Sequence, residues 1–404
     1  MPKYSYHARD ESGKAVSGKL EAASPEALAD RLSHLGYIVT AIKENPTPIV
    51  LDNLFASFQR VKVNDMVMYT TQLASMIGAG LTLPAGLKIL AEQVENHKLK
   101  NATIAIFEDI KEGASFSAAL NKFPDIFSEL FINMVASGEV SGNLEDVLKQ
   151  LAKFLENEAD LKQKVTTALF YPVILVILGV VIIVFIVTAV LPAFVKIFLD
   201  AKVPLPLPTL IVYNINLFLR AFWHVFIGSL IAAFILLRWY NRTPAGRITI
   251  DTLKFRMPIW GPIVQQVTIA RFARTLAALL SSGISMLQAL ETTEKTVGNS
   301  VISEVLHNVA QNVSKGESLA KTLHESKVFP PMAVQMIAVG EETGSLEHLL
   351  NKIADYYELS TDYTLKRVTA LIEPLFLVII GGMVAFIFAS ILLPIFRMVS
   401  TLRH

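Results

Sequence analysis

Three long apolar runs constrain this chain more than any other feature of its sequence. They cover residues 173–191, about 221–237 and 375–393, and His224 is the one ionisable side chain inside them. A helix of about 20 residues crosses a hydrocarbon layer of about 30 Å, so the runs predict three transmembrane helices. The composition agrees, since 52% of residues are hydrophobic and 18% are charged. A transport role is disfavoured, because transporters place ionisable groups within the membrane.

Basic residues beside the runs indicate how the chain crosses the membrane. They lie before the first and third runs and after the second, the sides expected to face the cytoplasm. The N-terminus has no apolar signal region, so we expect it in the cytoplasm and the tail after the third run on the other side. The basic flanks are Lys162, Lys164, Lys366 and Arg367, and then Arg238, Arg242, Arg247, Lys254 and Arg256.

The chain contains two copies of one unit, offset by 202 to 203 residues. Residues 138–145, Gly-Glu-Val-Ser-Gly-Asn-Leu-Glu, match residues 340–347, Gly-Glu-Glu-Thr-Gly-Ser-Leu-Glu. The register holds into the membrane, where Pro172, Gly179 and Pro192 pair with Pro374, Gly381 and Pro394. Each unit is therefore a soluble helical domain followed by one membrane helix. The second apolar run has no counterpart and supplies the return crossing.

These patterns predict a mainly α membrane protein with two repeated six-helix bundles and a small α+β domain. Alternating strands around a helix capped by Ser24 indicate a ββαβ module at the N-terminus. The expected divisions are 1–44 for this module, 45–60 linker, 61–170 first helical repeat, 171–195 first span, 196–217 loop on the far side of the membrane, 218–238 second span, 239–264 cytoplasmic connector, 265–372 second repeat, 373–396 third span and 397–404 tail.

Prolines mark both ends of the first and third spans. Pro172 and Pro374 fall at the membrane mouth, where loss of one backbone donor is expected to kink or restart a helix. Pro192 and Pro394 occupy the matching positions at the far ends. These four membrane-mouth prolines are candidate site positions, and the helices that run toward Pro172 and Pro374 are expected to link each bundle mechanically to its span.

The paired Gly-Glu-x-Ser/Thr-Gly motif is the strongest local signal. The second glycine suits a tight left-handed turn between antiparallel helices, and the hydroxyl or Asn143 would cap the next helix. The glutamate would either cap exposed amides at the turn or receive a basic residue of a partner; the sequence favours neither. The candidate turn and partner-binding residues are Gly138, Glu139, Ser141, Gly142, Gly340, Glu341, Thr343 and Gly344.

Signals of catalysis and cofactor binding are missing from the sequence. There is no cysteine, no P-loop and no His-Glu-x-x-His, which disfavours thiol chemistry, nucleotide hydrolysis and zinc sites. Acidic clusters near Glu156 and Glu341 are typical of solvated helix faces, so no metal is expected. A net charge of +1 disfavours nucleic acid as a partner. We expect a protein that is not an enzyme and carries no cofactor.

The chain resembles the type II secretion F family in its N-terminal Tyr4-x-Tyr6-x-Ala8-x-Asp10-x-x-Gly13 with Gly18 and Ala22, in its doubled motif and in its three spans. The resemblance implies an oligomeric inner-membrane platform of type II secretion, type IV pilus or MSHA-type pilus assembly. It implies contact with a cytosolic hexameric ATPase, with pilin or pseudopilin subunits and with other inner-membrane assembly proteins, and a periplasmic C-terminus. The alternative is a repeat-built membrane transporter or channel.

Overall fold

The computed structural model describes residues 3–9, 15–21, 24–34, 36–44, 60–200 and 207–401. Its N-terminal module has strands β1 (Lys3–Arg9), β2 (Ala15–Glu21) and β3 (Ile38–Glu44) and helix α1 (Pro25–Ser33). The strands are antiparallel in the order β2-β1-β3. The Ser24 hydroxyl accepts the Ala27 amide, which confirms the predicted cap. Of the predicted linker 45–60, residues 45–59 lie outside the described residues.

Each repeat forms six helices, as the sequence predicts. The first repeat comprises α3 (Val63–Gly78), α4 (Leu83–Gln93), α5 (His97–Lys111), α6 (Phe116–Leu120), α7 (Glu129–Ser141) and α8 (Leu144–Phe185). The second comprises α12 (Trp260–Ser281), α13 (Met286–Thr296), α14 (Ser300–Ser314), α15 (Leu319–Glu325), α16 (Pro331–Thr343) and α17 (Leu346–Thr401). Helix α11 (Pro244–Arg256) lies within the predicted connector 239–264 and packs on α14.

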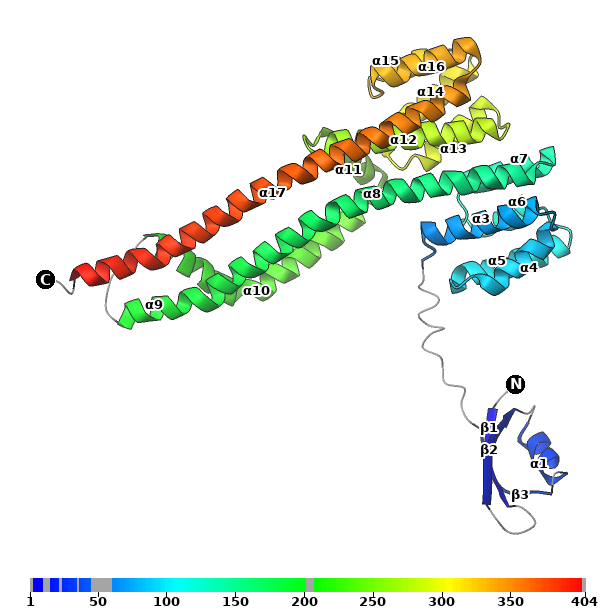
Figure 1. Cartoon of the computed structure of the whole chain (residues 1–404), viewed down its shortest axis with the longest axis horizontal. Coiled ribbons are helices and arrows are strands. Elements are labelled where there is room, and N and C mark those ends of the chain that lie inside the picture. The colour runs from blue at the N-terminus through cyan, green and yellow to red at the C-terminus, as the bar shows by residue number, and fades with distance from the viewer. Residues whose placement is uncertain are drawn as a thin grey trace.

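The two bundles share one hydrophobic core. Leu73 and Leu148 of the first repeat and Leu276 and Leu350 of the second are fully buried in the same cluster. Polar contacts also join the bundles, among them Asn133 to Thr292, Ser137 to the Ser282 carbonyl and Gln150 to Ser281. The repeats therefore pack as a single body (Figure 1).

Among the described residues, three helices are long and apolar enough to cross a membrane: Leu144–Lys196, Arg220–Tyr240 and Leu346–Leu392. The first consists of α8, a π-helical turn η1 (Ile186–Val190) and α9 (Leu191–Asp200); the second belongs to α10 (Leu207–Tyr240) and the third to α17. Figure 1 shows α8 and α17 running side by side.

The stretch 196–217, expected as a loop on the far side of the membrane, is mostly helical where the structure describes it, although it still lies between two candidate spans. Helix α9 continues to Asp200 and α10 already begins at Leu207, so the described ends of the stretch are helical. The prolines around residue 206 suggested a loop, but Pro208 falls in the first turn of α10. A proline there costs no hydrogen bond, because the first amides of a helix have no partner within it.

Pro172 and Pro374 are expected to kink or restart the helix, and neither restarts it; a kink at either proline stays a prediction. Helix α8 continues through Pro172, and α17 continues through Pro374. A proline removes one backbone donor, and the remaining hydrogen bonds together with packing against a neighbouring helix maintain the structure. Each bundle is thus joined to its span by uninterrupted helix.

Candidate functional site

The first glycine turn closes α7 against the start of α8. Gly142 adopts the left-handed conformation with φ +71°, and the Asn143 amide donates to the Gly138 carbonyl at 3.0 Å. A Cβ at Gly142 would meet nothing within 4 Å, so the backbone conformation alone favours glycine there. The predicted left-handed turn is present at this position.

Glu139 reaches from this turn to a different helix. Its carboxylate accepts the amide of Phe116 at 2.5 Å, the amide of Ser117 at 2.9 Å and the Ser117 hydroxyl at 2.5 Å. These amides begin α6, and the Ser115 hydroxyl accepts a third from Ala118. Glu139 therefore caps the N-terminus of α6, where an anion also meets the positive end of the helix dipole.

The second copy repeats this arrangement. Gly344 is left-handed with φ +68° and ends α16. The Glu341 carboxylate accepts the amides of Leu319 and Ala320 at 2.7 and 2.9 Å and the Ser318 hydroxyl at 2.7 Å. Because these groups begin α15, Glu341 caps that helix as Glu139 caps α6.

The capped amides are not at the glutamate's own turn, where one of the two alternatives drawn from the sequence put them. They lie 21 to 23 residues earlier in the chain, at a helix start that folding brings alongside. One signal points to this contact: Ser115 and Ser318 begin the two helices at matching positions of the repeat. The role of either glutamate toward a partner stays a prediction.

The first glycine of each motif allows close packing. A Cβ at Gly138 would lie 3.1 Å from the Val147 side chain, and a Cβ at Gly340 would lie 2.9 Å from the Cα of Leu346. Helices α7 and α16 therefore approach the following helix at a distance that only glycine permits without displacement. This requirement is tighter at Gly340, because its nearest neighbour is backbone at 2.9 Å, whereas the nearest backbone atom at Gly138 is the Cα of Leu144 at 3.3 Å.

The motif hydroxyls have a different role from the one expected. Ser141 and Thr343 donate to the carbonyls of Ser137 and Val339, one turn earlier in their own helices, at 2.8 and 2.7 Å. Asn143 precedes α8, yet its side chain accepts no capping hydrogen bond. The prediction that Asn143 caps α8 is therefore wrong; its backbone torsions, φ −111° and ψ 50°, are not those of a capping residue.

The outer face of both turns is open to solvent. Val140 is 92% exposed, although it is apolar, and the matching Glu342 is exposed as well. Figure 1 shows the starts of α8 and α17 at the end of the molecule opposite α9 and the C-terminus. The two turns thus present their free positions on the side farthest from the membrane spans.

The candidate prolines lie in three different settings. Pro172 is buried within α8, whereas Pro374 is exposed within α17. Pro394 also lies within α17, and its side chain is outside the described part of the structure. Pro192 follows the π-helical turn η1, whose last amide hydrogen bond runs from Leu191 back to the Ile186 carbonyl.

Side chains of helix α10 supply hydrogen bonds to backbone carbonyls that lie just before Pro192. A proline at 192 cannot donate to the carbonyl of Thr188, four residues earlier. The Arg220 guanidinium donates to that carbonyl at 2.8 Å, and the Asn216 amide donates to the neighbouring carbonyl of Val187 at 2.7 Å. Sequence reasoning missed both residues, because neither belongs to a motif.

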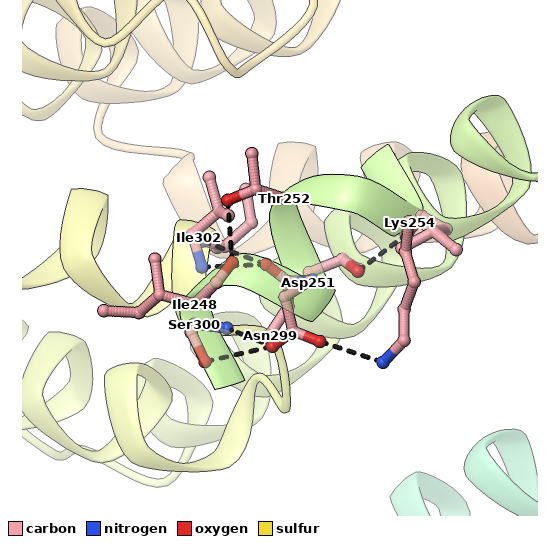
Figure 2. Close-up of polar contacts among 10 residues, drawn as sticks. Ile248, Asp251, Thr252, Lys254, Asn299, Ser300 and Ile302 are labelled. Atoms are coloured by element: carbon pink, nitrogen blue, oxygen red, sulfur yellow. Dashed lines mark hydrogen bonds and ion pairs between the residues drawn. The ribbon is translucent and has the colours of Figure 1, made fainter. Parts of the chain in front are cut away.

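A third carboxylate caps a helix from a distant element, at Asp251 on α11 (Figure 2). It accepts the amide and the hydroxyl of Ser300, each at 3.0 Å, and Lys254 donates at 2.9 Å. Burial alone would raise the pKa of Asp251, but these hydrogen bonds outweigh it and lower that pKa below its ordinary value. The interaction anchors α11 to the start of α14.

Known protein families match this sequence along most of its length. The family model described as type II secretion system (T2SS), protein F, matches the chain twice, at residues 69–192 and 272–394. The chain belongs to this protein F family. The model of the family's N-terminal domain matches residues 1–43. The two matches confirm the internal repeat, and together they cover most of the chain.

Relatives of this protein F family member carry two kinds of name. A type IV pilus assembly protein PilC of Thermus thermophilus is 39% identical over 100% of this chain and 99% of its own length. A PilC of Myxococcus xanthus is 36% identical over 98% of the chain and 95% of its own length. A type II secretion system protein F of Vibrio cholerae is 32% identical over 98% of each.

Proposed function

We propose that the chain is a non-enzymatic platform in the inner membrane that couples a cytosolic assembly ATPase to extraction and polymerisation of pilin or pseudopilin subunits. The continuity of α8 and α17 carries this proposal. Each helix begins at a glycine turn on the exposed end of the bundles and continues without a break into a membrane span. Force applied at the turns would therefore reach the membrane.

The names of the relatives support a role in pilus assembly or secretion, since these relatives are named as type IV pilus assembly proteins and a type II secretion system protein. In the proposed orientation the N-terminus and both bundles are cytoplasmic, as the positive-inside rule favours, and the C-terminus is periplasmic. The protein would work as a homo-oligomer alongside other inner-membrane assembly proteins.

The motif residues would serve docking in two ways. Glu139 and Glu341 have hydrogen bonds within the bundle, so they would hold the shape of the turns rather than contact a partner directly. The exposed Val140 and Glu342 would provide the contact itself. The partner then needs an apolar surface opposite the first turn and a basic group opposite the second.

Binding of the full-length protein in detergent to the host's hexameric secretion and pilus ATPases tests this proposal. Val140→Asp combined with Glu342→Arg should weaken binding at least about tenfold, because an apolar contact and a charge contact are both lost. The matched control is Met68→Asp with Glu325→Arg, which makes the same changes at exposed positions away from the turns.

Binding that falls equally in both double variants would reject the turns as the docking surface. No binding of the unaltered protein to any of these ATPases would reject the coupling role. Solute flux through liposomes that hold this protein alone would instead favour the transporter or channel alternative.

A further inference from the structure

A cavity of about 640 Å³ opens where the second membrane helix leaves its span. Its lining includes Arg242 and Arg247 from the turn after α10 and the first part of α11. Ser303 and Glu304 of α14 line it from the opposite element. Nothing in the turn motif or in the proposed coupling role makes use of this cavity.

The side chains of Arg242 and Arg247 are free to bind a ligand. Within the described residues, neither guanidinium has a hydrogen bond or an ion pair, and both residues are exposed. By contrast, the cavity's Lys295 pairs with Glu129 at 2.6 Å, and its His307 contacts Glu294 at 3.3 Å.

Two cations of the lining remain available to an anion. Arg242 and Arg247 have no partner among the described residues, whereas Lys295 is paired with Glu129. The acidic residues Glu294 and Glu304 complete the charged lining. Arginine is also the side chain best shaped to hold a phosphate group, through paired N–H donors.

The position of the arginines matches the depth of lipid headgroups. The candidate span ends at Tyr240, so Arg242 comes only two residues beyond it. Trp239 and Tyr240 are exposed and are of the types that favour the membrane–water interface. The polar headgroup layer adds roughly 5–8 Å on each side of the hydrocarbon, which is the level that the residues after Tyr240 occupy.

The cavity walls are fixed relative to one another. Asp251 bonds the amide and hydroxyl of Ser300, so α11 is held against the start of α14 (Figure 2). The Thr243 hydroxyl accepts the Gly246 amide and thereby caps α11 next to Arg242. A ligand would therefore enter a preformed site, with little ordering of the chain on binding.

We propose that this cavity binds the headgroup of an anionic phospholipid, with its phosphodiester held by Arg242 and Arg247. The lipid would belong to the leaflet that meets the bundles, and its acyl chains would lie along α10. The proposal goes beyond the coupling role and requires only that α10 spans a membrane. It therefore stands or falls independently of ATPase binding.

Lipid binding to delipidated full-length protein in mild detergent, measured by native mass spectrometry, tests the proposal. Phosphatidylglycerol should bind, and Arg242→Gln with Arg247→Gln should weaken that binding at least about tenfold, because two charge-assisted contacts are lost. The control, Arg238→Gln with Arg256→Gln, removes the same charge from the same flank outside the cavity lining and should change affinity less than about twofold.

Three results would overturn the proposal. Equal loss in both double variants would mean general attraction to the basic flank, and zwitterionic phosphatidylcholine binding as tightly as phosphatidylglycerol would reject selection of an anionic headgroup. Soluble glycerol phosphate that binds in the cavity as tightly as the lipid would assign the site to a free phosphate compound. All four arginines are exposed, so the variants should fold, and circular dichroism checks this.

Discussion

At the scale of single residues, Glu139 and Glu341 compensate for the shortness of the helices that they cap. Helix α6 has 5 residues and α15 has 7, and helices this short are unstable on their own. Each gains a carboxylate from the glycine turn that follows it in the chain. The turn and the short helix therefore stabilise one another.

Glu139→Ala and Glu341→Ala should each destabilise the protein, by about 1–3 kcal/mol, because buried or half-buried amides lose a charged acceptor. Chemical unfolding of the full chain in detergent measures this loss, and faster hydrogen exchange in α6 or α15 localises it. Glu342→Ala is the matched control, because this neighbouring glutamate is exposed. Equal destabilisation by the control would contradict the capping role.

The two glycines of the second motif should differ in their response to alanine. Gly344→Ala has room for the new methyl group and costs only the strain of a left-handed residue, about 1–2 kcal/mol. Gly340→Ala places its Cβ 2.9 Å from the Cα of Leu346, so α16 must move away from α17. Unfolding experiments should therefore rank Gly340→Ala as the more damaging change; the reverse order would refute the close-packing explanation.

At the scale of elements, helix type and order follow from local pattern. The six-helix repeats could be predicted because their signals are local in the sequence. These signals include the helical spacing of the apolar residues Leu144, Leu148 and Leu151 and the glycine at 142, which suits a left-handed backbone conformation. The cap from Glu139 to α6 could not, because it depends on which helices become neighbours after folding. Helix continuity at Pro172 was missed for the same reason, since packing outweighs the local proline preference.

Arg220 and Pro192 should be energetically coupled. The arginine donates a hydrogen bond to the Thr188 carbonyl, and a proline at 192 has no amide hydrogen to donate to it. Arg220→Leu should cost about 1–2 kcal/mol through the orphaned Thr188 carbonyl. In a Pro192→Ala background a backbone amide can reach that carbonyl, so the same arginine change should cost less. A double-mutant cycle on unfolding free energies measures the coupling, with Arg238→Leu as the control. Additive effects would rule it out.

At the scale of the whole molecule, the repeats are similar in sequence and unequal in packing. A Cβ at Gly179 of the first span would lie 2.8 Å from Phe376 and Ile380 of α17, so that glycine permits close contact. A Cβ at Gly381, its counterpart in the second repeat, would have no such neighbour within 4 Å. Duplication could be read from the sequence, but this asymmetry could not, because it arises from how the two copies face each other.

The shared core predicts that the bundles unfold together. Leu276→Ala, at a fully buried position of the second repeat, should cost about 2–5 kcal/mol and accelerate slow hydrogen exchange in both repeats. Leu287→Ala, at a partly exposed position, should have a small effect on both the unfolding free energy and the hydrogen exchange. Faster exchange confined to the second repeat would show that the bundles are independent.

The unbroken path of α17 through Pro374 makes this helix a long lever. Its 56 residues span roughly 84 Å at about 1.5 Å per residue, so a tilt of about 5° at one end displaces the other end sideways by about 7 Å. A small angular change at the glycine turn thus becomes a sideways movement within the membrane that is large enough to alter how the helix packs against its neighbours.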